Sequence, residues 1–170
     1  MTGIVSSASS NGVAPPSWSD SWTHLRVDRR TPSYCRVTFD HPPVNAITAT
    51  TIAELGELVE LMESDADLKV VVFDSANPDF YLTNYDTEHD SAWPELLMRL
   101  SRARAVCVAC MRGLARGEGI EFVLACDLRF ASRERAVLGQ FEMGTGVVVI
   151  ADDRLDDEVD AIASRLSRDA

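Results

Sequence analysis

The sequence predicts an α/β fold in which buried strands alternate with amphipathic helices. Two short apolar runs, Lys69–Phe73 and Ala105–Met111, have the composition of strands that are covered on both faces. Helical periodicity appears in the segment that starts near Thr51 and again over Asp152–Leu166. Alternation of this kind is typical of a sheet with helices packed on it.

Composition limits the class of protein and of partner. With 170 residues, 46% of them hydrophobic, the chain is large enough for one domain with a core of its own. The net charge of −11 argues against nucleic acid and anionic membranes as partners. We find no signal peptide and no apolar stretch of membrane-spanning length, and the four cysteines lie in apolar contexts. These features predict a cytoplasmic protein with reduced thiols.

The chain divides into three parts by composition. Residues 1–20 are rich in Ser, Gly, Ala and Pro without periodicity, and we interpret them as a disordered leader. Residues 21–150 carry the strand and helix patterns of the folded core. Residues 151–170 form an amphipathic helix whose apolar stripe is Leu155, Val159, Ile162 and Leu166.

The first half of the core begins with a predicted hairpin. Strands at His24–Asp28 and Tyr34–Asp40 alternate polar and apolar residues and flank a Thr-Pro-Ser turn. Thr51 and Glu54 have the spacing of a capping box for the helix that follows. That helix has an apolar face made of Ile52, Leu55, Val59 and Met62. Residues 74–90, rich in Asn, Pro and acids, are expected to form a loop.

The second half continues the alternation. A helix is predicted over Trp93–Ala103, with Pro94 in its first turn. Short strands are predicted at Asp127–Ala131 and Val137–Gly139. A glycine-rich stretch, Met111–Asp127, connects the predicted strand at 105–111 to the one at 127–131, and its second half is predicted to be an apolar helix.

This glycine-rich stretch is the first candidate for a functional site. Gly113, Gly117 and Gly119 permit a sharp turn and a close approach of the backbone to another group. Backbone N–H groups at the start of the helix point outward, where they can stabilise a developing negative charge. Glu121 lies one turn into that helix and is either solvated or catalytic.

Residue types that bind metals do not form a recognisable pattern, so no metal site is predicted. Cys107 and Cys110 match CxxC, but they lie three apart on a strand, which directs them to opposite faces. The three histidines have no metal-like spacing, and the acids at 152–158 lack the glycine and the length of an EF-hand loop. Buried thiols and a solvated acidic helix face explain these residues.

Several segments, in their order along the chain, resemble the crotonase superfamily of enoyl-CoA hydratases and isomerases. HPPVNAI (41–47) is similar to the family's strand-to-helix turn, and KVVVFDSANPDFYLTNYD (69–86) to its first oxyanion loop. RGLARGEGIEFVLACDLRFAS (112–132) resembles the glycine-rich loop with the central helix and next strand. LGQFEMGTGV (138–147) resembles the segment of the second catalytic glutamate.

The resemblance implies a fold and a chemistry. The fold is a spiral of ββα units, here shortened toward the C-terminal end because residues after Val148 resemble a much later family segment. The implied enzyme is a lyase or isomerase of fatty acid metabolism that acts on acyl-CoA thioesters, with coenzyme A as part of the substrate and no permanently bound cofactor. The implied assembly is a homo-oligomer built on trimers.

Site residues follow from the matching positions. Leu82 and Glu118 correspond to the two backbone N–H donors of the oxyanion hole, and Glu121 and Glu142 to the two carboxylates of the hydratases. Arg112, Arg116 and Gly117, around the glycine loop, are candidates for contacts with coenzyme A.

Two departures from the family pattern keep a second function open. The family has glycine where this chain has Thr83 and Glu118. At ~4 Å, the Glu118 carboxylate would repel an oxyanion by about 1 kcal/mol in water and by about 4 kcal/mol at an effective dielectric of 20. In addition, the shortened region is the one that covers the acyl pocket. The alternative is therefore an inactive crotonase homologue that serves as a binding or subunit-contact module.

Overall fold

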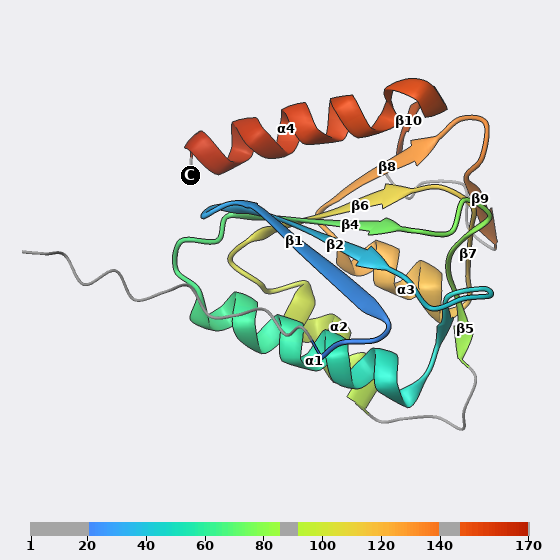
Figure 1. Ribbon diagram of the computed structural model, residues 1–170, viewed down its shortest axis with the longest axis horizontal. Coiled ribbons are helices and arrows are strands. Elements are labelled where there is room, and N and C mark those ends of the chain that lie inside the picture. Colours follow the sequence, from blue (N-terminus) through green and yellow to red (C-terminus); the bar gives the residue numbers. More distant parts are fainter. Residues whose placement is uncertain (1–20, 86–91, 140–146, 170) are drawn as a thin grey trace, which may run out of the picture.

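The computed structural model describes residues 21–85, 92–139 and 147–169, which form two sheets with helices packed around the larger one (Figure 1). The predicted leader, residues 1–20, lies outside the described residues. In spatial order the larger sheet consists of β1 (Leu25–Thr31), β2 (Tyr34–Phe39), β4 (Val70–Ser75), β6 (Val106–Met111), β8 (Leu128–Ser132) and β10 (Val147–Ile150). β1 is antiparallel to β2, and all later pairs are parallel.

A smaller parallel sheet lies at one end of the larger one (Figure 1). Its strands, in order, are β3 (Ala46–Ile47), β5 (Phe80–Tyr85), β7 (Leu114–Arg116) and β9 (Val137–Gly139). Each strand of this sheet follows directly after one strand of the larger sheet, so the chain turns from one sheet into the other four times.

After three of these turns a helix returns the chain to the start of the next strand. The helices are α1 (Ala49–Ser64), α2 (Ala92–Leu100) and α3 (Glu118–Ala125). The resulting order β2-β3-α1, β4-β5-α2 and β6-β7-α3 confirms the α/β class and the spiral of ββα units. The fourth pair, β8 and β9, leads instead to β10 through residues 140–146, which are outside the described part of the chain.

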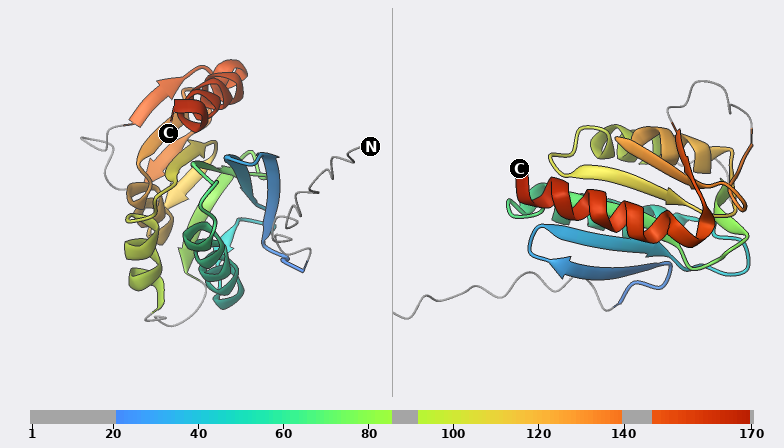
Figure 2. Two further views of the ribbon diagram at one scale, coloured as in Figure 1. Left: turned by 90° about the vertical axis from the view of Figure 1, so that its left-hand side faces the viewer. Right: turned by 90° about the horizontal axis from the view of Figure 1, so that it is seen from above.

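The two faces of the larger sheet have different covers (Figure 2). α1, α2 and α3 lie on one face, and α4 (Leu155–Asp169), which follows a 3-10 turn at Asp152–Arg154, lies on the other (Figure 1). In β4 the side chains alternate accordingly: Val71 and Phe73 belong to the cluster under α1–α3, whereas Val70 and Val72 belong to the cluster under α4. The strand is buried on both faces, as its apolar composition predicts.

The N-terminal hairpin and the main helices confirm the periodicity argument. Tyr34 pairs with Thr31 across the predicted turn, and the side chains of Ile52, Leu55, Val59 and Met62 are all buried on α1. The predicted strands at 105–111, 127–131 and 137–139 are present with small shifts of their ends. α2 ends at Leu100, three residues earlier than predicted, and α4 buries Ala163 fully while Ile162 is only partly buried.

The predicted start of α1 is wrong by one turn. The N-cap is Thr48, which forms a capping box with Thr51, because the Thr48 Oγ1 accepts from the Thr51 N–H and the Thr51 Oγ1 accepts from the Thr48 N–H. Glu54 instead accepts hydrogen bonds from the N–H groups of Thr23 at 2.6 Å and Leu25 at 2.9 Å. Its carboxylate therefore attaches the beginning of β1 to α1.

Four short strands do not follow from the sequence pattern, namely β3, β5, β7 and β10. The expectation that residues 74–90 form a loop is wrong for Phe80–Tyr85. Asn45 holds β5 in place, since its Nδ2 donates to the carbonyl groups of Phe80 at 3.0 Å and Tyr81 at 3.2 Å. The strand is thus formed by a partner 35 residues away along the chain.

Candidate active site

The glycine-rich stretch forms a strand, a tight turn and the beginning of α3. Gly113, with φ of 72°, precedes β7, and a Cβ placed there would lie 2.3 Å from the Asp79 carbonyl carbon. Gly117, with φ of 56°, is the N-cap of α3, and its carbonyl accepts from the Ile120 N–H at 2.9 Å. Both glycines occupy conformations that other residues rarely adopt. The turn therefore directs the first amides of α3, which starts at Glu118, out of its N-terminal end.

Gly119 brings the start of α3 against β5. A Cβ at position 119 would lie 2.1 Å from the Leu82 carbonyl oxygen, a distance that excludes every side chain larger than hydrogen. Leu82 itself is buried, with 1% of its surface exposed. The two segments that were predicted to supply the oxyanion donors, at Leu82 and Glu118, are therefore in direct contact through Gly119.

The amides of β5 alternate between its two neighbouring strands. The Thr83 N–H donates to the Asn45 carbonyl at 3.1 Å, so it points toward β3. Leu82 pairs with Ala115 of β7, on the side from which the chain enters α3. Because consecutive amides of a strand point to opposite sides, the N–H of Leu82 faces β7, and so does that of Asn84.

Glu121 lies one turn into α3, and its side chain is exposed. Its Oε2 accepts a hydrogen bond from the indole Nε1–H of Trp93 at 3.0 Å. Trp93 belongs to α2, is 4% exposed and stacks on Phe122 with ring centroids 6.5 Å apart. Sequence reasoning did not identify Trp93 as a site residue, because its position on an apolar helix face is typical of a core residue.

The other predicted carboxylate, Glu142, lies at 140–146, outside the described residues. The remaining predicted residue at the turn, Glu118, is half-buried.

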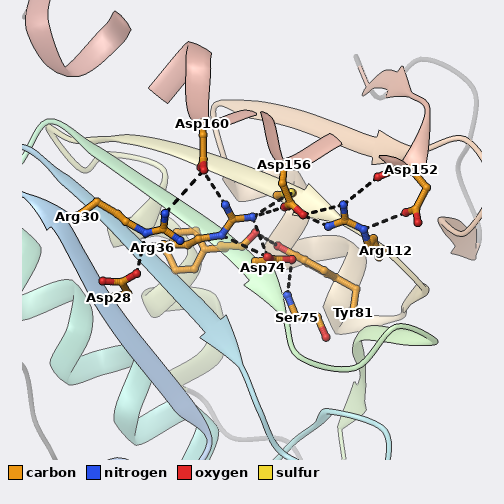
Figure 3. A network of polar contacts seen from close by, with 12 residues as sticks. Asp28, Arg30, Arg36, Asp74, Ser75, Tyr81, Arg112, Asp152, Asp156 and Asp160 are labelled. Atoms are coloured by element: carbon orange, nitrogen blue, oxygen red, sulfur yellow. Dashed lines mark hydrogen bonds and ion pairs between the residues drawn. The ribbon is translucent and has the colours of Figure 1, made fainter. Parts of the chain in front are cut away.

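The two arginines beside the glycine loop have different surroundings. Arg116, on β7, is exposed, and its Cγ lies 3.3 Å from the position that a Cβ of Gly139 would take. Arg112 contacts α4 and the turn before it: its Nε is 2.9 Å from Asp152 Oδ1, and its Nη2 is 2.9 Å from Asp156 Oδ2. Arg112 thus takes part in attaching the C-terminal helix (Figure 3).

A second guanidinium, that of Arg36, extends this polar network beneath α4 (Figure 3). Arg36 donates to Asp74 of β4 at 2.8 Å and to Asp156 and Asp160 of α4 at 2.6 and 2.9 Å. Burial alone would lower the pKa of Arg36, but the charge and hydrogen bond of Asp74, together with the charges of Cys110 and Asp156, outweigh it and raise the pKa well above its ordinary value. Arg36 therefore remains charged in the interior.

One group in the described residues has metal-ligand spacing, and it belongs to this network. One ligand atom from each of Asp74, Cys110 and Asp156 lies within 4.8 Å of the others. The Arg36 Nη2 contacts all three groups, including the Cys110 Sγ at 3.7 Å. The guanidinium therefore supplies the positive charge that these carboxylates need.

The thiols of the CxxC motif face opposite sides of β6, as their spacing predicts. Cys107 belongs to the cluster under α1–α3 and Cys110 to the cluster under α4. Both are free and buried, and burial raises the pKa of each thiol far above its ordinary value. These are inert core residues.

With the turn, the close approach at Gly119 and the carboxylate of Glu121 described, the chain can be compared with known proteins. The model of the "Enoyl-CoA hydratase/isomerase" family matches residues 29–159. The chain belongs to this family. A Bacillus subtilis relative named "Probable enoyl-CoA hydratase" is 28% identical over 124 residues, which are 66% of this chain and 48% of the relative. The human relative "Enoyl-CoA delta isomerase 1, mitochondrial" is 26% identical, over 65% of this chain and 41% of its own length.

Solved structures of the enoyl-CoA hydratase/isomerase family have the same fold. A Streptomyces avermitilis protein assigned to the enoyl-CoA hydratases superposes with a TM-score of 0.78 at 29% identity, covering 88% of this chain and 73% of its own. The enoyl-CoA hydratase of Bacillus anthracis, at 18% identity, superposes with a TM-score of 0.77 over 85% of this chain and 77% of its own. These matches confirm the crotonase fold.

The chain is shorter than these relatives. It spans about half the length of the curated relatives that it matches, and about three quarters of the solved structures. β9 and β10 are separated only by residues 140–146. Among the described helices, none has the length and apolar character needed to cross a membrane.

Proposed function

We propose that this chain acts on an acyl-CoA thioester as an enoyl-CoA hydratase or isomerase. The observation that supports the proposal most directly is the contact between Gly119 and the Leu82 carbonyl. It holds the start of α3 against β5, which is the proximity that an oxyanion hole built from amides of both elements would need. Glu121 lies one turn further along α3, where a carboxylate is needed for proton transfer.

In the proposed oxyanion hole, one N–H comes from Glu118 and the other from Leu82. The amides on the β7 side of β5 belong to Leu82 and Asn84, and Leu82 also pairs with Ala115 in the ladder. A donor that remains in the ladder is less available to a substrate, so the Asn84 N–H is the second candidate. In either arrangement two backbone donors stabilise the negative charge on the thioester oxygen.

For hydration, the proposed roles of Glu121 and Glu142 complement each other. A water molecule loses a proton to one carboxylate while its oxygen forms a bond to the β-carbon of the enoyl thioester. The π electrons of the double bond move to the thioester oxygen and form an enolate. The other carboxyl group then gives a proton to the α-carbon, and the oxyanion charge returns to the carbonyl. One carboxyl group gains a proton and the other loses one, so the addition balances.

Coenzyme A would contact the chain near the glycine loop through Arg116 and the amide end of α3 at Gly117. Arg112 could meet a phosphate only after leaving Asp152 and Asp156, which it contacts at 2.9 Å each. We therefore assign the phosphate contact to Arg116, whose side chain is exposed. We also propose that copies of the chain assemble as trimers, which sedimentation at several concentrations would test.

A non-catalytic function has its own support. Glu121 is exposed, and the chain spans about half the length of its curated relatives. An exposed carboxylate is a weaker proton-transfer group, because water competes for it and screens nearby charges. In this alternative the chain binds acyl-CoA, or contacts another subunit, without turnover.

The test uses a four-carbon trans-2-enoyl-CoA, whose conjugated double bond loses its absorbance on hydration. We expect measurable hydration, and a loss of about 100- to 10,000-fold in kcat in Glu121→Gln. Glu60→Gln, at an exposed position on α1, is the matched control and should keep its activity. Binding of a saturated acyl-CoA with neither hydration of this substrate nor double-bond migration in a 3-enoyl-CoA would support the binding module. Absence of any binding to either acyl-CoA would exclude the enzyme and the acyl-CoA-binding module.

A further inference from the structure

The contact between Trp93 and Glu121 determines how the carboxylate is presented. Trp93 is 4% exposed and is fixed by packing, with its ring stacked on Phe122 at an interplanar angle of 30°. Its Nε1–H reaches Glu121 Oε2 at 3.0 Å. An exposed glutamate on a helix normally samples several rotamers, so a hydrogen bond from a fixed indole restricts the carboxylate to one of them.

The two oxygens of Glu121 are therefore not equivalent. An indole N–H is a donor only, so the oxygen that it contacts acts as an acceptor and presents no proton in that direction. Within the described residues, the bond from Trp93 is the only side-chain hydrogen bond of Glu121. Oε2 is thus occupied by Trp93, and Oε1 is left for a water molecule or a substrate.

We propose that Trp93 is a positioning residue for Glu121: it holds Oε2 so that Oε1 is the oxygen that exchanges the proton in the reaction. This inference rests on the proposed function, since it assigns a role within the same site. The residue acts from α2 on a carboxylate of α3, and the two helices contact each other. Orientation of a proton-transfer group changes the rate of the chemical step and leaves substrate binding unaffected.

A purely structural role for Trp93 predicts a different result. A buried indole needs an acceptor, and Glu121 could simply supply it. In that case the loss of the N–H would lower the free energy of unfolding but would leave kcat and KM unchanged. A fall in kcat at constant KM therefore distinguishes the positioning role from a purely structural one.

The experiment replaces the donor and preserves the ring. Trp93→Phe keeps an aromatic side chain against Phe122 but has no N–H. We expect kcat to fall by about 10- to 100-fold with KM unchanged. Trp22→Phe is the matched control, because the Nε1–H of Trp22 also donates to a glutamate, Glu57 on α1, at 2.7 Å. That variant should keep its kcat.

A second comparison tests whether Trp93 acts through Glu121. In the Glu121→Gln background, Trp93→Phe should change the residual rate by less than about twofold, because coupled residues are not additive. If Trp93→Phe does not fold, the benzothiophene analogue of tryptophan at position 93 removes the N–H and preserves the shape. Trp93→Phe and the benzothiophene-substituted protein are first checked for folding by thermal unfolding.

The outcomes separate this inference from the proposed function. An active wild-type chain whose Trp93→Phe variant keeps its kcat would overturn the positioning role and leave the function intact. A wild-type chain without hydratase or isomerase turnover would overturn both. The indole proton resonance then still reports the contact: it should shift in Glu121→Ala for Trp93 and stay unchanged for Trp22.

Discussion

The two faces of the larger sheet are held to their helices by different forces. Under α1–α3 the core is continuous and apolar, with edge-to-face contacts such as that between Phe73 and Phe122 at 5.0 Å. Under α4 the apolar cluster is smaller and surrounds the Arg36 guanidinium, whose side chain is 8% exposed. The first face has a mainly apolar core with one buried carboxylate, that of Glu54, beside β1, whereas the second is organised around a buried guanidinium.

The difference shows what each interaction contributes. Apolar burial is non-directional and stabilises roughly in proportion to area. The removal of buried ions from water opposes their attraction, so an ion network contributes little net stability but fixes position strongly. Arg36 has carboxylate partners on both β4 and α4, so the network determines where α4 lies, while Leu155, Val159 and Ala163 supply its apolar contact.

The same substitution on the two faces should give the largest difference. Leu55 on α1 and Leu155 on α4 are 1% and 0% exposed. We expect Leu55→Ala to lower the free energy of unfolding by about 3 to 5 kcal/mol, and Leu155→Ala by roughly 2 to 3 kcal/mol, within the range for buried leucines. The smaller value follows because α4 can separate from the sheet while the larger core persists. Denaturant unfolding measures both, and equal losses would contradict the comparison.

Removal of Arg36 should have an intermediate effect with a specific location. Arg36→Ala leaves Asp74, whose side chain is 15% exposed, without its buried partner, and we expect a loss of roughly 2 to 4 kcal/mol. Amide hydrogen exchange should increase first in α4. Arg154→Ala, which removes an exposed pair with Glu158 on the same helix, is the control and should cost about 0.3 to 0.5 kcal/mol. Uniform exchange across both faces would contradict a local role.

Acid should weaken the α4 face by a smaller amount. Burial would raise the pKa of Asp156, but its hydrogen bonds and charge contacts with Arg112 and Arg36 outweigh this and lower the pKa. A carboxyl group with a lowered pKa contributes stability that is present above its ordinary pKa near 4 and is lost as the pH falls through the folded-state value. We therefore expect amide hydrogen exchange in α4 to increase below about pH 4. Asp156→Asn should reduce this dependence, and an unchanged pH profile would contradict it.

The sequence predicted most of the elements that have their own periodicity. Lys69–Phe73 and the helix with Leu55 are present because local apolar patterns decide them. β3, β5, β7 and β10 were missed, since strands this short depend on partners elsewhere in the chain, such as Asn45 for β5. No internal repeat is visible in the sequence, although the structure repeats the ββα unit. The units therefore share their order of strands and helix but not their residues.

Motifs indicated some of the residues that meet around the start of α3, but not all of them. Family resemblance pointed to the segments of Leu82 and Glu118, which are in contact through Gly119. It could not find Trp93, because an indole on an apolar helix face carries no signal of its partner. Arg36 was also missed: the alternation in β2 predicts a side chain in water, whereas carboxylates from β4 and α4 cover it.

The absence of a side chain at position 119 has a consequence for how the proposed site can vary. The Leu82 carbonyl oxygen lies 2.1 Å from where a Cβ of residue 119 would be. Gly119 therefore sets the distance between β5 and α3, which belong to successive ββα units. A methyl group there would move the entire helix, and with it both the amide of Glu118 and the carboxylate of Glu121. The spacing between the proposed backbone donors and the position of the Glu121 carboxylate would therefore change together if residue 119 had a Cβ atom.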